Sequence, residues 1–294
     1  MSDCCVPGAG RAGSYDLAVV GAGSAGFSAA ITAAEKGARV ALVGHGTIGG
    51  TCVNVGCVPS KTMIRAAEAL HAGRAARRFA GLVGEAHLTG WAALIAAKDD
   101  LVAGLRQKKY VDLLAAYDGI NYLEGVARLS GAGLALSGEA ISAGRMILAT
   151  GASPARADIP GLERVPYLTS TTALELAELP RSLLVVGGGY IGCELAQMFA
   201  RMGTEVTLVT RGRLLPGAEP EISDALTGYL RDDGITVRTG FAYRRIGLAE
   251  GGVTLEIETG GRQEAIAAAQ VLIATGRTPN TAELGLPDAG VTLT

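Results

Sequence analysis

The sequence lacks a strong excess of charge of either sign. Its 26 Lys and Arg residues nearly balance its 28 Asp and Glu residues, which gives a formal net charge of -2. One short run of cations, Arg74, Arg77 and Arg78, is explained as a solvated helix face. We therefore expect no nucleic-acid partner.

The sequence also lacks an apolar run suited to crossing a membrane. The nearest candidate, residues 17–34, contains Gly21, Gly23 and Gly26 and is better explained as a strand, a turn and a helix. Asp3 lies where a signal peptide would carry positive charge, and no apolar stretch follows it. A cytoplasmic protein without a membrane partner is expected.

Cysteine and histidine are scarce, with five and three residues in the chain. Cys4, Cys5, Cys52, Cys57 and Cys193 are too few and too irregularly spaced to cross-link a secreted fold of this size. In a reducing compartment, a catalytic or metal-binding role for cysteine is the stronger hypothesis.

Glycine, in contrast, is abundant. The 43 glycines and the 49% hydrophobic content are typical of an α/β protein with many tight turns between strands and helices. With 294 residues, the chain is long enough for two domains, each of which typically has about 100 to 200 residues.

The first half contains one strand–helix–strand unit. After an irregular leader at 1–14, the pattern predicts a strand at 17–20, a helix at 24–36 and a strand at 39–43. Further segments are predicted in this order: helices at 61–80 and 91–116, a β-rich stretch at 122–136, and a strand at 145–150 that ends in Ala149-Thr150-Gly151. A connection rich in Pro and Gly follows at 152–161 and predicts a domain crossover.

The second half repeats this plan. A strand at 183–186, a glycine turn at 187–192, a helix at 191–201 and a strand at 205–209 precede strands at 236–239, 253–258 and 271–274. The last of these ends in Ala274-Thr275-Gly276, like its counterpart in the first half. The repeat predicts an α/β fold of two Rossmann-like dinucleotide-binding domains.

The first glycine motif is Gly21-Ala22-Gly23-Ser24-Ala25-Gly26, between a predicted strand and helix. Its glycines allow a tight turn, close approach of a pyrophosphate and packing of helix on strand, and the helix N-terminus favours an anion. A bland glycine turn is the weaker alternative. The following strand ends at Gly44 and His45, where the dinucleotide fold usually places a carboxylate for the ribose, so the ribose contact is in doubt.

The second motif is Gly187-Gly188-Gly189-Tyr190-Ile191-Gly192. The strand after it ends with Thr210, followed by Arg211 and Arg213, where a site for NAD would carry a carboxylate. Guanidinium groups can hold a 2′-phosphate through paired hydrogen bonds. NADPH is therefore favoured over NADH, with two merely solvated arginines as the alternative.

A cysteine pair, Cys52 and Cys57, lies between the two motifs and is followed by Pro59 and a helical pattern. Thiols near a helix N-terminus are stabilised as thiolates, and this spacing can close a small disulfide ring. A zinc site would need further ligands, which His45, His71 and His87 do not supply at suitable spacing. Two inert core cysteines are the other alternative.

The segment from Gly49 to Lys61, GGTCVNVGCVPSK, resembles the active-site motif of the pyridine nucleotide-disulfide oxidoreductases. The resemblance extends from Tyr15 to the C-terminus and implies FAD in the first domain and NADPH in the second. It implies that Cys57 faces the flavin, that Cys52 faces the substrate, and that Lys61 and Glu194 form a buried ion pair near the flavin.

The same resemblance implies a set of cofactor contacts, among which Tyr190 covers the nicotinamide pocket. These residues are Gly21, Gly23, Ser24, Ala25, Gly26, Gly50, Thr51, Lys61, Thr150, Gly151, Gly187, Gly189, Tyr190, Ile191, Gly192, Arg211, Arg213 and Gly276.

Within the family, several stretches look most like the mercuric reductases. These are 149–154, 166–171, 276–281 and Lys109-Tyr110, with Tyr110 expected beside the metal. The implied reaction is reduction of Hg(II), a soft cation bound by Cys52 and Cys57, to Hg(0) in mercury detoxification. The alternatives are a disulfide reductase like glutathione reductase or dihydrolipoyl dehydrogenase, and a non-catalytic fragment that binds nucleotides or metals.

The family resemblance also predicts the domain limits. We expect an FAD domain at 15–157, an NADPH domain at 158–281, and the start of a return to the FAD domain at 282–294. The C-terminal dimerisation domain of this homodimeric family is expected to be absent. Cys4 and Cys5 could collect Hg(II), although an incidental place in the leader is the stronger prediction.

Overall fold

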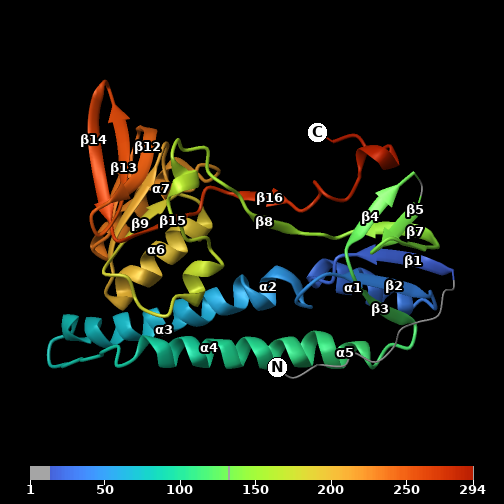
Figure 1. The fold of residues 1–294 in the computed structure, drawn as a ribbon. Helices are drawn as coiled ribbons and strands as arrows, with labels where there is room; N and C mark the ends of the chain where they lie inside the picture. The colour runs from blue at the N-terminus through green and yellow to red at the C-terminus, as the bar shows by residue number, and fades with distance from the viewer. Residues whose placement is uncertain (1–13, 132, 294) are drawn as a thin grey trace. The chain divides into compact units, whose positions relative to one another are not determined.

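The computed structural model describes residues 14–131 and 133–293, which form two compact units (Figure 1). The first unit comprises the described residues up to Val58, Asp100–Ser153 and the chain from Pro279 onward. The second comprises Pro59–Asp99 and Pro154–Thr278. Cys4 and Cys5, with the predicted leader up to residue 13, lie outside the described residues.

No helix in these described stretches is long and apolar enough to span a membrane.

The first unit is built on a parallel sheet with the order β3-β2-β1-β7. Its strands are β1 (Tyr15–Val20), β2 (Val40–Gly44), β3 (Ile120–Glu124) and β7 (Ala143–Leu148). Strand β2 is buried along its whole length, as expected for an apolar strand in a sheet covered on both faces.

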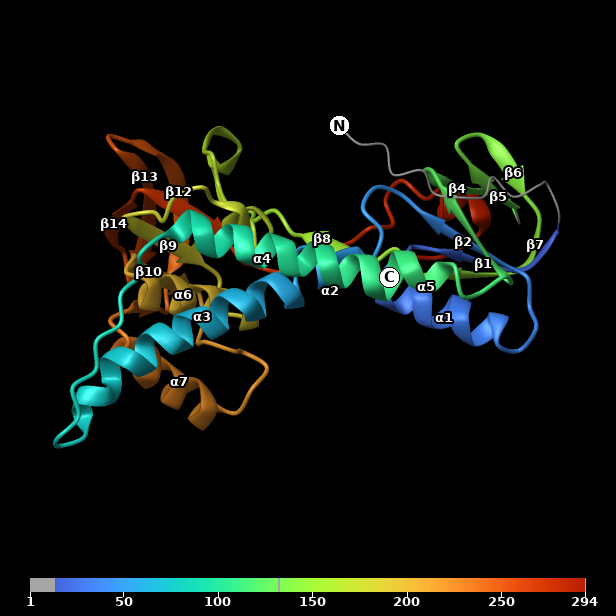
Figure 2. The same cartoon turned by 90° about the horizontal axis from the view of Figure 1, so that it is seen from below.

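The two faces of this sheet are covered by different layers. On one face, Phe27 of α1 (Ser24–Ala34) packs with Val19, Leu42 and Leu114. Figure 2 shows α1 and α5 (Asp112–Leu114) along this sheet. An antiparallel sheet covers the other face, formed by β4 (Ala127–Ser130), β5 (Gly133–Leu136) and β6 (Glu139–Ile141).

The second unit repeats the parallel sheet, in the order β11-β10-β9-β15. Its strands are β9 (Ser182–Val186), β10 (Glu205–Thr210), β11 (Thr236–Thr239) and β15 (Gln270–Ile273). In both sheets the first strand of the unit lies between its second strand and its last. The two-fold repetition predicted from the sequence is confirmed.

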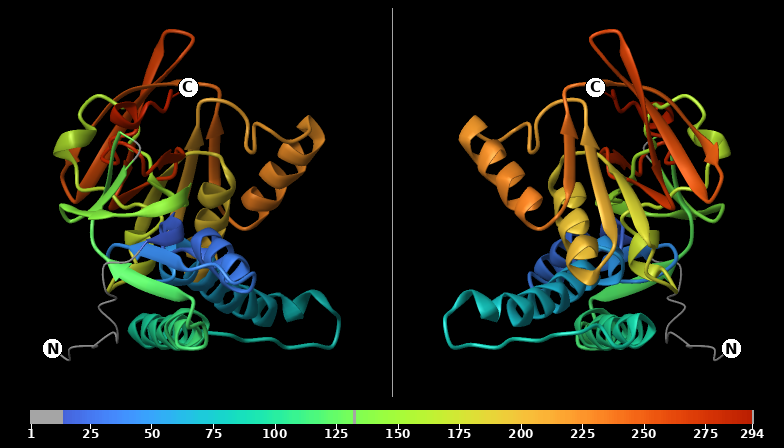
Figure 3. Two further views of the ribbon diagram at one scale, coloured as in Figure 1. Left: turned by 90° about the vertical axis from the view of Figure 1, so that its right-hand side faces the viewer. Right: turned by 90° about the vertical axis from the view of Figure 1, so that its left-hand side faces the viewer.

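Helices cover one face of the second sheet and strands cover the other (Figure 3). The helices are α3 (Cys57–Ala75), which enters this unit at Pro59, α6 (Tyr190–Met202) and α7 (Pro220–Asp232). The strands form an antiparallel sheet of β12 (Ala242–Ala249), β13 (Gly252–Thr259) and β14 (Arg262–Ala268). Alternate residues of β9 serve the two cores, with Leu183 on the helical side and Leu184 on the other.

The remaining helical elements and two short strands complete the described fold. The helical ones are α2 (Gly50–Asn54), α4 (Trp91–Arg106), η1 (Ala76–Arg78), η3 (Leu162–Arg164), η4 (Thr172–Glu175), η5 (Pro287–Ala289) and the π-helical turn η2 (Gln107–Val111). Two short strands, β8 (Ala152–Pro154) and β16 (Arg277–Pro279), pair where the chain passes between the units.

The structure corrects the predicted domain limits. The predicted first domain, 15–157, is not continuous, because Pro59–Asp99 belongs to the second unit. Met63 and Trp91 are buried in the core that contains Phe199, and the Trp91 indole donates a hydrogen bond of 2.8 Å to the Leu176 carbonyl. The crossover lies at 153/154 rather than 157/158, and the return begins at 279 rather than 282.

Replacement of Met63 by alanine tests this partition. Its side chain is fully buried in the core of the second unit. Loss of the side chain should reduce the free energy of unfolding by about 2 to 5 kcal/mol, measured by urea denaturation.

Arg65→Ala on the same helix is the control, because this side chain is 79% exposed. Its ion pair with Glu68 is worth only about 0.5 kcal/mol. Equal effects of the two substitutions would show that α3 is not anchored in this core.

Candidate functional site

The first glycine turn is formed by close contacts between backbone atoms. Gly21 has a positive φ of 118°, and a Cβ there would lie 2.1 Å from the Ala149 carbonyl oxygen. A Cβ on Gly26 would lie 1.7 Å from the Gly21 carbonyl oxygen. No side chain fits at either position, so the turn is held against the loop after β7 and against α1.

Helix α1 begins at Ser24 directly after this turn. Its N-cap residue, Gly23, has an extended backbone, and no side chain caps the first N–H groups. These groups and the helix dipole favour an anion such as a pyrophosphate. The local geometry therefore fits the nucleotide-binding role predicted for the motif.

The turn opens into a cavity of about 900 Å³ within the first unit, large enough for a sizeable cofactor. Nine residues predicted as site residues line it: Gly21, Gly23, Ser24, Ala25, Gly50, Thr51, Cys52, Thr150 and Gly151. Gly26 supports the turn rather than lining the cavity.

The sequence reasoning missed other parts of the cavity wall, among them Asn280. Its side-chain amide donates to the Thr150 carbonyl at 2.9 Å, and its amide oxygen accepts from Ser153 Oγ at 2.8 Å. Asn280 thus fixes the Ala-Thr-Gly turn after β7. Its place in the segment 276–281, which resembles the family, was the signal that could have identified it.

Tyr122 is a second residue that the sequence did not reveal. A Cβ on Gly44 would lie 2.5 Å from the Tyr122 hydroxyl and 2.9 Å from the Ala22 Cβ. The end of β2 carries no carboxylate. The Tyr122 ring therefore occupies the space that a side chain at residue 44 would take. Tyr122, Gly44 and His45 all line the cavity.

The cysteine segment is pressed against the glycine turn. Gly50, the first residue of α2, has a φ of 66°, and a Cβ there would lie 2.5 Å from the Gly23 Cα. The Asn54 amide donates to the Ile48 and Gly50 carbonyls at 2.9 Å each and accepts from Arg106 at 3.0 Å. These contacts fix the helix that carries Cys52.

The two thiols are brought together as predicted. Cys52 lies in α2, and Cys57 is the first residue of α3, at the helix N-terminus. A side-chain hydrogen bond with Cys57 raises the pKa of Cys52, burial raises it further, and the charge of Lys109 opposes both. Cys57 is exposed and Cys52 is half-buried.

Cys193 belongs to a different environment. It is buried in the second unit, where burial and then the Glu194 charge raise its pKa to about 11. Its thiol is therefore protonated at neutral pH and unreactive.

Tyr110 lies in the π-helical turn η2 and contacts the glycine turn. Its hydroxyl is 3.1 Å from Ser24 Oγ, and its ring packs edge-on against Phe27 with centroids 4.8 Å apart. The ring also lies beside Gly49, where a Cβ would come within 3.1 Å of it. Its contacts are those of a residue that supports the turn, and its predicted place beside a metal stays a prediction.

The second glycine turn repeats the first. Gly187 has a φ of 123°, a Cβ there would lie 2.3 Å from the Ala274 carbonyl, and one on Gly192 would lie 1.9 Å from the Gly187 carbonyl. Gly189 caps α6, and Tyr190 and Ile191 begin it. Gly276 lies in the loop after β15.

The side chains predicted for NADPH lie around this second turn. The Tyr190 side chain is 73% exposed, and Arg211 and Arg213 are exposed beyond β10. The Arg213 guanidinium donates to the Ala218 carbonyl at 3.2 Å, which orders the loop after β10. The Arg211 guanidinium opposes the burial that raises the pKa of Tyr243 to about 12, so the arginine lies near that ring.

The predicted ion pair between Lys61 and Glu194 forms within the second unit, with Lys61 Nζ 2.6 Å from Glu194 Oε2. The prediction that it is buried is wrong, since the side chains are 56% and 41% exposed. The two helices turn Met63 and Leu195 into the core instead, which leaves Lys61 and Glu194 at its edge.

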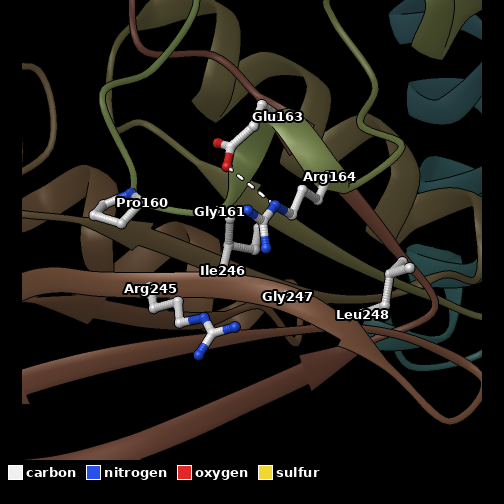
Figure 4. Close-up of a pocket in the computed structure, with 8 residues that line it drawn as sticks. All are labelled: Pro160, Gly161, Glu163, Arg164, Arg245, Ile246, Gly247 and Leu248. Atoms are coloured by element: carbon white, nitrogen blue, oxygen red, sulfur yellow. Dashed lines mark ion pairs between the residues drawn. The ribbon is translucent and has the colours of Figure 1, made fainter.

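A smaller hollow of about 380 Å³ lies in the second unit (Figure 4). Glu163 in its wall is within 3.6 Å of both Arg156 and Arg164, so its carboxylate is already paired. The hollow contains neither glycine turn nor any cysteine. Across the described residues, no three His, Cys, Asp or Glu side chains are grouped to hold a metal ion.

The chain is similar to known proteins over almost its whole length. Residues 15–294 match the family described as pyridine nucleotide-disulphide oxidoreductase. The mercuric reductase of Staphylococcus aureus is 47% identical over 96% of this chain and 51% of its own length, and that of Streptomyces lividans is 45% identical over 94% and 60%. The chain spans about half the length of the curated relatives it matches.

A solved structure shows the same fold. The HOCl-induced flavoprotein disulfide reductase RclA from Escherichia coli, in a Cu(II) complex, superposes with a TM-score of 0.81 at 32% identity, covering 96% of this chain and 61% of the other. The resemblance to mercuric reductases and the predicted fold class are confirmed.

Replacement of Cys57 by alanine tests the electrostatics of the pair. It removes the hydrogen bond that raises the pKa of Cys52 most, so this pKa should fall and alkylation by iodoacetamide should reach its half-maximal rate at lower pH. Peptide mass spectrometry identifies the modified cysteine. Cys193 is the internal control and should resist alkylation up to about pH 9. An unchanged profile for Cys52 would mean that the thiols do not interact.

Proposed function

The chain belongs to the pyridine nucleotide-disulphide oxidoreductase family, and we propose that it carries the cofactor sites and the cysteine pair of an NADPH-dependent mercury(II) reductase. One observation carries the proposal: Cys52 lines the same cavity as the first glycine turn, and its side chain is hydrogen-bonded to Cys57. The similarity to mercuric reductases supports Hg(II) as the substrate.

The residues of the first cavity fit FAD. The uncapped N-terminus of α1 and the bare backbone at Gly21 and Gly23 would hold the pyrophosphate, with Thr51 and Thr150 in the cavity wall. The second turn fits NADPH, because Arg211 and Arg213 place two cations beyond β10. When bound, these cofactors would supply two electrons to the cysteine pair, taken from NADPH as a hydride.

The cysteine pair would bind and reduce the metal. The oxidised pair accepts two electrons, so that the S–S bond breaks and two thiols form. As thiolates, Cys52 and Cys57 are soft ligands that suit the soft Hg(II) cation. Transfer of two electrons from the dithiolate to Hg(II) would give Hg(0) and form the S–S bond again. One NADPH and one Hg(II) would therefore be consumed for each Hg(0), NADP⁺ and proton that is formed.

Charged neighbours assist this chemistry. Lys109 lowers the pKa of Cys52 against the larger effects that raise it, so it favours the metal-binding thiolate. Cys57 is the first residue of α3, at the helix N-terminus. The assignment of Cys57 to the flavin side and Cys52 to the substrate side is part of the proposal, as are a role for the Lys61–Glu194 pair near the flavin and a homodimeric full-length protein.

A disulfide reductase is the second candidate, favoured by the likeness to a flavoprotein disulfide reductase. Both activities need the same thiols, so the substrate distinguishes them. Turnover of Hg(II) in preference to glutathione disulfide or lipoamide supports the proposal, and the reverse preference would replace it.

Single replacement of Cys52 or Cys57 by alanine should reduce the rate of NADPH oxidation with Hg(II) by about a thousandfold or more, because neither thiol alone holds the metal and receives both electrons. Cys193→Ala is the matched control and should retain the activity, because that buried thiol lies outside the cavity. Activity in either single variant near that of the control would contradict the role of the pair.

The double variant Arg211→Gln/Arg213→Gln tests the cofactor preference. Loss of two charge-assisted hydrogen bonds to a 2′-phosphate should weaken NADPH binding by about tenfold to a hundredfold and leave NADH binding unchanged. Isothermal titration with both nucleotides measures this difference. Arg262→Gln, on β14, is the control for a lost surface charge. Equal effects on NADPH and NADH would show that the arginines do not read the phosphate.

A further inference from the structure

The end of β2 lacks the carboxylate that dinucleotide folds place there for the ribose. Gly44 holds that position and is buried at the carboxyl end of the strand, beside the first glycine turn. A side chain at this position would meet Ala22 of that turn, with its Cβ only 2.9 Å from the Ala22 Cβ. The position therefore faces the cavity, and Gly44 has no side chain that could hydrogen-bond a ribose.

The neighbouring strand supplies a hydroxyl. Strands β2 and β3 are parallel, with Leu42 opposite Tyr122 and Gly44 opposite Glu124. Tyr122 thus belongs to the same face of the sheet as Gly44, two pairs before the strand ends. Its ring reaches forward across Gly44, because a Cβ at residue 44 would lie 2.7 Å from the ring and 2.5 Å from the hydroxyl oxygen.

The hydroxyl of Tyr122 is available to a ligand. No hydrogen bond to this hydroxyl occurs in the described part of the chain, although Tyr122, Gly44 and Gly21 line one cavity. Burial and then the Glu124 charge raise the pKa of Tyr122, so the phenol stays protonated at neutral pH. A neutral phenol can donate one hydrogen bond and accept others.

We propose that the Tyr122 hydroxyl, placed over the bare backbone of Gly44, takes the part of the missing carboxylate and hydrogen-bonds the adenosine ribose of the dinucleotide in the first cavity. This inference rests on the proposed FAD site. Gly44 and Tyr122 act together, because a side chain at residue 44 would displace the ring that carries the hydroxyl.

The dissociation constant of FAD, measured by fluorescence quenching, provides the first test. Tyr122→Phe keeps the ring over Gly44 and removes only the hydroxyl, so it should weaken FAD binding by about threefold to tenfold, the value of one hydrogen bond. Tyr117→Phe is the matched control. Its hydroxyl contacts Glu35 at 3.3 Å and does not line the cavity, so FAD binding should be unchanged.

Deoxyribose analogues show whether the hydroxyl acts on the ribose. In the unsubstituted chain, FAD that lacks either the 2′- or the 3′-hydroxyl of the adenosine should bind more weakly than FAD. In Tyr122→Phe that difference should disappear, because both sides of the same hydrogen bond have been removed. A penalty of equal size in both proteins would overturn the inference.

An independent test restores a carboxylate at residue 44 and removes the Tyr122 ring. Gly44→Glu alone should weaken FAD binding, since the new side chain collides with the ring. Gly44→Glu/Tyr122→Ala removes the collision and should bind FAD more tightly than either Gly44→Glu or Tyr122→Ala. Additive effects of the two substitutions would contradict the coupling.

The outcomes separate this inference from the proposed function. An unsubstituted chain that binds no FAD would overturn both. FAD binding that Tyr122→Phe leaves unchanged would overturn the role of Tyr122 alone and would leave the FAD site intact.

Discussion

Close backbone packing at the first glycine turn is the constraint on which the proposed site depends. Gly21 lies against the Ala149 carbonyl, and Gly50 lies against the Gly23 Cα, at separations that exclude a Cβ on either glycine. The first contact joins the turn to the loop after β7, and the second joins it to the helix that carries Cys52. The first glycine turn and Cys52 thereby share one cavity wall.

The packing around α2 also determines the positions and the surroundings of the two thiols. Asn54 hydrogen-bonds the backbone around α2 and receives a hydrogen bond from Arg106, so the cysteine segment is held from two directions. Cys57 begins the next helix, and the hydrogen bond between the cysteine side chains raises the pKa of Cys52. Cys57 is exposed and Cys52 is half-buried, so the two sulfurs have different surroundings.

The sequence was sufficient to predict those features of the fold that depend on a few neighbouring residues. The glycine spacing, the Ala-Thr-Gly turns and the apolar strands were sufficient for the repeated strand–helix–strand plan and for both turns, because each depends on a few consecutive residues. The spacing of Cys52 and Cys57 was sufficient to predict a cysteine pair at the start of a helix. FAD and the mercury substrate came from the family resemblance, whereas the preference for NADPH came from Arg211 and Arg213 after the second motif.

Long-range packing could not be predicted in the same way. Nothing near Met63 or Trp91 in the sequence indicates that these residues share a core with Phe199, so the second unit was assigned too few residues. The exposure of Lys61 and Glu194 depends on how α3 and α6 face that core. The ring of Tyr122 reaches Gly44 from a strand 78 positions further along the chain, so the missing carboxylate was visible in the sequence but its replacement was not.

The central claim is that the first cavity and the cysteine pair form one redox unit. Anaerobic titration of the FAD-loaded, oxidised chain with dithionite tests it most directly, since the flavin and the disulfide each accept two electrons. The account predicts uptake of about four electrons per FAD in the unsubstituted chain and about two in Cys52→Ala, with the flavin spectrum recording the order of reduction. Uptake of about two electrons in both proteins would contradict the claim, because the cysteine pair would then take no part in the redox chemistry of the bound flavin.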